Sequence, residues 1–197
     1  VINTTQLAPA SEKRVENLRT SILEGAWDAL EYLLQFLEEN KDDYPLWEAS
    51  DAYAYQYEYL ISSARKFDEI FKINRSRLTF LNWRPTMADV ELLHIAPQIS
   101  PELVAELKTQ IKEDTLTAAN AVLLPFVQKA LAYITAANNG YPAMETRGTK
   151  YLMVAKTMLD DTPTDYPTYA ASSVYDSTLT NYQPYENEDD SLLGVFG

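Results

Sequence analysis

The chain lacks cysteine and has little histidine and glycine, and each shortage excludes a class of function. Without cysteine there can be no disulfide, thiol nucleophile, cysteine-bound zinc or iron–sulfur cluster. The only histidine is His94, so one chain cannot build a site that needs two. No glycine lies between Gly25 and Gly140, which excludes a glycine-rich phosphate loop there. We therefore expect no catalytic, cofactor-binding or metal-binding residues, and a protein that is not an enzyme.

Long hydrophobic runs are also missing, although 46% of the residues are hydrophobic. No stretch of 18 apolar residues occurs, so we expect no membrane span and no membrane partner. A chain of 197 residues is long enough for one ordinary domain with arms, or for two small domains. A domain of this size buries roughly 70% of its unfolded surface, so it needs no covalent cross-links to be stable.

The charge is strongly acidic and unevenly distributed. The formal net charge is −13, and residues 160–197 supply −8 of it because they contain eight acids and no lysine or arginine. An acidic chain is unsuited to tracking DNA phosphates, which requires a basic face. The body of the protein is only mildly acidic, and the C-terminal segment accounts for most of the imbalance.

Apolar residues spaced by three or four predict a helical body. In residues 11–40 they form one apolar stripe: Val15, Leu18, Ile22, Ala26, Leu30, Leu33 and Leu37. A second stripe predicts one helix over 50–71, and we expect Pro85 and Pro125 to kink or break later helices. The predicted helix N-caps include Ser11, Ser50 and Ser100.

These patterns predict an all-α fold class, a helical bundle of five to seven helices. The expected divisions are an N-terminal extension 1–10, a helical body 11–159 and an extended, acidic, Tyr/Pro-rich C-terminal arm 160–197.

The C-terminal arm combines prolines, tyrosines and an apolar end. Residues 161–167 cannot continue a helix, because each proline lacks a backbone donor and restricts the residue before it. Residues 168–175, which include Tyr169 and Tyr175, could bind a partner by strand addition. The terminal apolar residues could pack on their own body or on a neighbouring subunit; they are Leu192, Leu193, Val195 and Phe196.

Two charge clusters lie next to each other in the sequence. Residues 65–84 have a net charge of +4, with Arg65, Lys66, Arg75, Arg77 and Arg84 as candidate contact residues. Residues 38–58 have a net charge of −6, with Glu38, Asp42 and Asp43 as candidates. Opposite patches on one body suit head-to-tail self-association, which gives a ring when the contact closes. The alternative is an ordinary surface whose charges pair within the chain.

Several short segments resemble a known group of proteins. They are Leu37-Glu38-Glu39-Asn40, Tyr44-Pro45-Leu46-Trp47, Ile95-Ala96-Pro97-Gln98-Ile99 and Leu123-Leu124-Pro125-Phe126. Over roughly residues 20–160 the chain is similar to a family of uncharacterised proteins encoded in phages and prophages of Bacteroidetes. That family resembles head–tail connector (adaptor) components of the phage neck.

The resemblance implies a structural protein of the virion, assembled in the host cytoplasm. It implies a homo-oligomeric ring, dodecameric by analogy, that joins the portal to tail or neck proteins while DNA passes through without specific binding. No catalytic residues and no cofactor carry over. Two other hypotheses stay open: an acidic DNA mimic or other protein-binding inhibitor, and a hydrolase or lyase that uses carboxylates.

Overall fold

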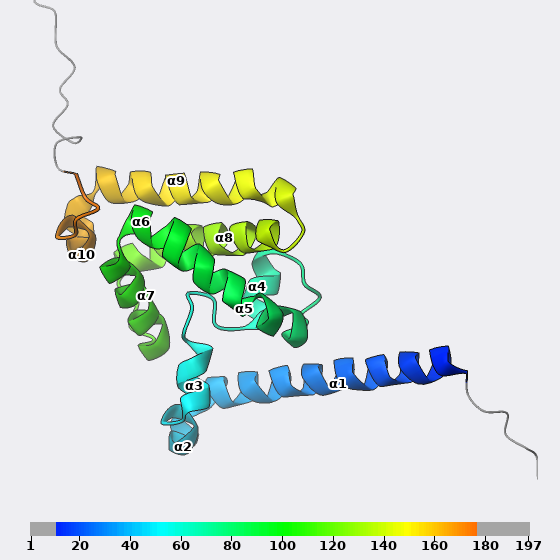
Figure 1. The fold of residues 1–197 in the computed structure, drawn as a ribbon. Coiled ribbons are helices and arrows are strands. Elements are labelled where there is room, and N and C mark those ends of the chain that lie inside the picture. Colours follow the sequence, from blue (N-terminus) through cyan, green and yellow to red (C-terminus); the bar gives the residue numbers. More distant parts are fainter. Residues whose placement is uncertain (1–10, 177–197) are drawn as a thin grey trace, which may run out of the picture.

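The structure, a computed structural model, describes residues 11–176, and within that range it is helical and contains no strand (Figure 1). The predicted all-α class is confirmed. The N-terminal part contains α1 (Glu12–Glu39), η1 (Lys41–Asp43), α2 (Pro45–Glu48), α3 (Asp51–Gln56) and α4 (Ala64–Ile70). The central and C-terminal parts contain α5 (Arg77–Val90), η2 (Glu91–Ile95), α6 (Ala96–Ile99), α7 (Pro101–Glu113), α8 (Ala118–Asn138), η3 (Pro142–Met144), α9 (Glu145–Asp161), η4 (Pro163–Asp165) and α10 (Pro167–Ala170).

Helix α8 is the centre of the core. It packs most extensively against α9, and it also contacts α5 and α4. The α8–α9 contact is close because Gly148 has no side chain: a Cβ there would lie 2.6 Å from Cγ1 of Ile134. By length and mean hydropathy α8 could cross a bilayer, but 56% of its most apolar window is buried inside the body. Its apolar composition is therefore explained by its central position in the fold.

Of the two effects expected for the prolines inside helices, a kink or a break, the structure excludes the break. Helix α5 continues through Pro85 and α8 continues through Pro125. Tertiary packing holds both segments helical, since Met87 lies after the first proline and Val127 after the second, and both are buried. Beyond α5 the backbone widens into one turn of π-helix, η2.

The helix predicted over 50–71 is two helices, α3 and α4, separated by an irregular segment. The apolar stripe is buried as expected, including Tyr53, Leu60 and Phe67. The break occurs because other groups bind the backbone between the helices. The N–H of Leu60 donates to Glu91, and its carbonyl accepts from Gln128. Ser63 then caps the start of α4.

The C-terminal segment is not an extended arm in its first part. After α9 ends at Asp161, residues up to 176 form η4, α10 and a turn that pack on the body. Each of the two prolines starts a helical turn, a position that needs no N–H donor. Tyr166 and Tyr169 are buried there, and the Tyr166 hydroxyl donates to the carbonyl of Ala119. The prolines thus marked the end of α9 correctly, but the extended conformation predicted for residues 162–176 is wrong.

Helix α1 lies apart from the other helices and projects beyond the body with its N-terminal half (Figure 1). Ser11 caps its first turn, as the sequence predicts. None of its residues is buried. Within residues 11–176, the body therefore does not enclose the apolar stripe that the sequence predicts on this helix.

Candidate functional site

The C-terminal half of α1 is held on the body by charged and polar contacts. Glu31 accepts from Arg77 at 2.7 Å, and it also lies 3.4 Å from the backbone N of Arg65. Two turns later Glu38 accepts from the Tyr57 hydroxyl at 2.5 Å and from Gln56 at 3.0 Å. These contacts tie one side of α1 to α4, α5 and the end of α3.

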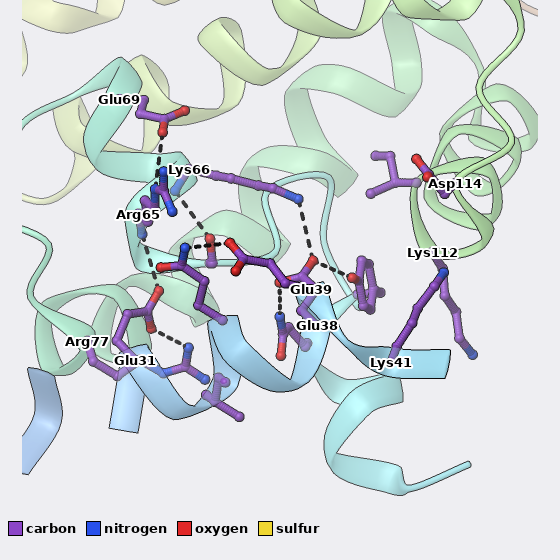
Figure 2. Close-up of a pocket in the computed structure, with 16 residues that line it drawn as sticks. Glu31, Glu38, Glu39, Lys41, Arg65, Lys66, Glu69, Arg77, Lys112 and Asp114 are labelled. Carbon is purple, nitrogen blue, oxygen red and sulfur yellow. Dashed lines mark hydrogen bonds and ion pairs between the residues drawn. The ribbon is translucent and has the colours of Figure 1, made fainter. Parts of the chain in front are cut away.

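A charged cleft of about 430 Å³ lies along this contact (Figure 2). Its lining includes five acids and five bases, and the dashed lines in Figure 2 show that most of the central ones bind each other. Lys66 lies 3.7 Å from Glu38, and Gln35 donates to Glu39 at 2.6 Å. The charged lining residues are Glu31, Glu38, Glu39, Lys41, Arg65, Lys66, Glu69, Arg77, Lys112 and Asp114. The cleft is thus electrically balanced.

The raised pKa of Tyr57, which lines the cleft, fits a structural contact. Burial raises the pKa of Tyr57 far above its ordinary value, and the hydrogen bond to the Glu38 carboxylate raises it further. Tyr57 therefore stays protonated and remains a hydrogen-bond donor at all physiological pH values. A tyrosine held in this form fixes the end of α1 and is unsuited to act as a base.

The opposite side of α1 carries an apolar surface that the described residues leave largely uncovered, with Tyr44 packed edge-on against Phe36 at its C-terminal end. We call this surface the outer stripe: Val15, Leu18, Ile22, Gly25, Ala26, Ala29, Leu33 and Phe36. Its large side chains are 47% (Val15), 61% (Leu18), 62% (Ile22), 53% (Leu33) and 50% (Phe36) exposed. A helix has 3.6 residues per turn, so the centre of the outer stripe lies roughly 160° around the helix axis from the side that contacts the body.

A stripe of this kind is unusual on a single folded chain. Scattered apolar side chains are normal on a protein surface, but a continuous apolar surface marks a site of interaction. Helix α1 has 28 residues and is about 42 Å long at 1.5 Å per residue. The outer stripe runs along most of that length and is the candidate functional site.

The predicted basic and acidic clusters meet within the chain. Arg77 and Arg84 are buried, and their partners are Glu31 and Glu58. Lys66 pairs with Glu38, and Arg65 lies 3.6 Å from Glu69. The alternative of internal pairing therefore describes these residues.

Arg84 is predicted to contact a neighbouring subunit, but its guanidinium is enclosed within its own chain. Its guanidinium lies 3.7 Å from the ring centre of Tyr55 and 4.6 Å from that of Tyr59. It also donates to the carbonyl of Tyr55 at 2.9 Å and to Glu58 at 2.6 Å. A guanidinium enclosed by two rings and a carboxylate stabilises the segment before α4 and is not available to another subunit.

The other predicted contact residues divide into three groups. Arg75, Asp42 and Asp43 are exposed, so their role in subunit contact stays a prediction. Tyr169 is buried and bonds Asp160, and Tyr175 packs edge-on against its ring, so neither is free for strand addition. The remaining four lie outside the described residues: Leu192, Leu193, Val195 and Phe196.

Sequence reasoning missed the side of α1 that contacts the body. That side carries Glu31 and Glu38 at a spacing of seven, two full turns, with Leu34 between them. Carboxylates on a helix are normally assigned to solvent, and the long-range partner Arg77 cannot be identified from sequence spacing. The apolar periodicity is visible in the sequence, but the sequence does not show which side of the helix contacts the body.

Comparison with known proteins relates parts of the chain to a family. A family model described as a family of unknown function, DUF6712, matches residues 1–57 and 141–178, somewhat less than half of the chain. The first matched range contains all of α1, and the second contains η3, α9 and α10. No curated protein and no solved structure matches the chain.

Proposed function

We propose that this protein is a non-catalytic structural component that acts by assembling with copies of itself. We further propose that it is a head–tail connector (adaptor) of a phage neck, forms a ring between portal and tail proteins, and resides in the virion. The observation that carries the first proposal is the outer stripe, an apolar surface along a 28-residue helix that the body leaves uncovered. The connector assignment is supported by the resemblance of several sequence segments, such as Tyr44-Pro45-Leu46-Trp47, to the phage family.

Burial of the outer stripe supplies the driving force for assembly. Removing apolar surface from water yields about 25 cal/mol per Å², so five large side chains that are half exposed give a substantial gain when covered. A helix already held on the body by Arg77 and Tyr57 loses little conformational freedom on binding. The stripe is thus preorganised for a partner.

The alternative of an acidic DNA mimic has less support. A mimic needs unpaired carboxylates at fixed spacing on a rigid face. In the described residues many acids are paired with bases of the same chain, and these acids are Glu31, Glu38, Glu58, Asp68, Glu91 and Asp160. Such pairing neutralises the charge that a mimic would have to present.

Light scattering after size exclusion tests self-assembly. We expect the full chain to form a defined oligomer, and the double variant Leu18→Glu/Leu33→Glu to be monomeric with unchanged helical circular dichroism. Leu92→Glu is the matched control, because Leu92 is 68% exposed on η2, away from α1. A wild-type chain that stays monomeric at high concentration, or an α1 variant that assembles normally, would contradict the proposal.

The connector assignment has a separate test in the gene neighbourhood. Genes for terminase, portal and capsid proteins beside this gene would support it, and electron microscopy of the assembled neck would then locate the protein. A neighbourhood without virion genes would contradict the connector assignment and leave self-assembly standing.

A further inference from the structure

The outer stripe has a spacing that is symmetric about its own centre. Its positions follow one another at intervals of 3, 4, 3, 1, 3, 4 and 3 residues, so the order is the same in both directions. The centre of this pattern falls between Gly25 and Ala26. An antiparallel copy of the same helix therefore presents the same apolar positions at the same heights.

Each apolar side chain has an apolar counterpart across that centre, and in two of the three outer pairs a larger side chain faces a smaller one. Val15 falls opposite Phe36, Leu18 opposite Leu33, and Ile22 opposite Ala29. At the centre, where two such helices cross at a two-fold axis, the residues are Gly25 and Ala26, which permit the closest approach of two backbones. A Cβ added to Gly25 would meet nothing within 4 Å in its own chain, so the fold of one chain does not explain this glycine.

The charges of α1 favour the antiparallel direction. All its bases lie near its N-terminal end, at Lys13, Arg14 and Arg19, and residues 20–40 contain five acids and no base. Cations near a helix N-terminus are unfavourable for an isolated helix, because they oppose its dipole. Antiparallel pairing places them beside the acidic half of the other copy, in which Glu24 and Asp28 are exposed while Glu31 and Glu38 bind the body. Parallel pairing places like charges together.

We propose that the outer stripe of α1 binds the outer stripe of a second copy in the antiparallel direction, about a two-fold axis beside Gly25 and Ala26. This inference rests on the proposed function, namely that copies of the chain assemble. A two-fold contact closes on itself, because each residue pair occurs twice. Such a pair differs from the head-to-tail contact of a polar ring, so the inference rests on self-assembly and not on the connector assignment.

Cysteine cross-linking tests the direction, because the natural chain contains no cysteine. The variants Leu18→Cys and Leu33→Cys are oxidised separately and as an equal mixture. We expect a covalent dimer only in the mixture, since position 18 faces position 33 and neither faces itself. The control Leu92→Cys, placed on an equally exposed leucine of the body, gives no dimer with either.

The outcomes separate failure of this inference from failure of the proposed function. Covalent dimers of Leu18→Cys alone would mean parallel helices, and a dimer of Leu18→Cys with Leu92→Cys would mean that α1 covers the body of the next copy. Both results overturn antiparallel pairing and leave self-assembly intact. No cross-link in any mixture, together with a monomeric mass for the wild-type chain, overturns both.

A second variant tests the two-fold axis. Gly25→Leu adds bulk where the two helices approach most closely, at a position where a Cβ meets no described atom of its own chain within 4 Å. We expect the dimer dissociation constant to rise about tenfold or more. Ser21→Leu is the control, at an exposed position of α1 outside the outer stripe, and it should leave the dissociation constant unchanged. Equal effects of the two variants would contradict an axis at Gly25.

Discussion

Helices α1 and α8 are the two longest helices of residues 11–176, but within that range only α8 is covered by other parts of the chain. Helix α8 has 21 residues and buries eleven of them against α9, α5 and α4, whereas α1 has 28 residues and buries none. The two helices also differ in their apolar spacing, because α1 carries its apolar residues on one side whereas α8 buries seven consecutive residues, 130–136. A periodic apolar stripe therefore predicts that something covers the helix, and the neighbour can be the same chain or another molecule.

Truncating one leucine in each helix should give the largest difference between α8 and α1, measured as the change in the free energy of unfolding. Leu131→Ala creates a cavity in the core beside α8 and should lower the free energy of unfolding by about 2–5 kcal/mol. Leu18→Ala, on the exposed face of α1, should change it by less than about 0.5 kcal/mol in the monomer. Urea denaturation at low protein concentration measures both, and similar losses would contradict the difference in coverage.

The attachment of α1 to the body depends on one buried base. Arg77→Met leaves Glu31 without its charged partner, which should cost about 1.5–3 kcal/mol of the α1–body contact. Hydrogen exchange should then become faster at residues 27–39 and stay slow in α8. Arg75→Met, at an exposed base nearby, is the control. Unchanged exchange in α1 after Arg77→Met would show that other contacts hold the helix.

Replacing either of two helical glycines by alanine should change stability, and the two changes should have opposite signs. At Gly148 an added Cβ collides with Ile134, so Gly148→Ala should lower the free energy of unfolding by about 1–3 kcal/mol. At Gly25 the space is open, so Gly25→Ala should raise helix stability in the monomer by about 1 kcal/mol. Thermal denaturation of both variants checks the signs, and a loss at Gly25 would mean that the chain itself contacts this position.

The acid stability of the body depends in part on Asp68. Burial raises the pKa of this carboxyl, but hydrogen bonds from Lys72 and from the N–H groups of Arg75 and Ile73 outweigh burial, so the net pKa is lowered. The folded pKa is below the unfolded one, so the stabilisation is present above the ordinary value of 3.8 and is lost as the pH falls below it.

Asp68→Asn should remove this contribution, about 1–2 kcal/mol near neutral pH, and flatten the acid side of the stability profile. The carboxylate supports a tight turn in which Asn74 and Arg75 both have positive φ angles. Urea midpoints measured from about pH 6 down to about pH 3 check the difference. Parallel profiles for the variant and the wild type would contradict the assignment to Asp68.

Much of the fold could be predicted from local signals. Ser11, Ser50 and Ser100 cap the helices that they were expected to cap, because an N-cap is decided by a few neighbouring residues. The all-α class followed from apolar spacing. Features that depend on distant residues were missed: the helical path through Pro85, and the break between α3 and α4, where Glu91 binds the backbone of Leu60.

The candidate site could be predicted only in part for the same reason. The apolar positions of α1 are visible in the sequence, but the choice of face needs the Glu31–Arg77 pair, whose members are 46 residues apart. The charge clusters were identified correctly as complementary, and complementarity by itself cannot distinguish pairing within a chain from pairing between chains. Tyr169 was assigned to a partner because nothing local indicates its bond to Asp160.

Hydrogen exchange of the wild-type chain at low and high protein concentration tests the central claim most directly. If a second copy covers the outer stripe, the amides of residues 15–29 should exchange quickly in dilute solution and slowly in concentrated solution, while α8 is protected equally in both. Exchange in α1 that is equally fast at every concentration would contradict the claim that this helix is the assembly surface.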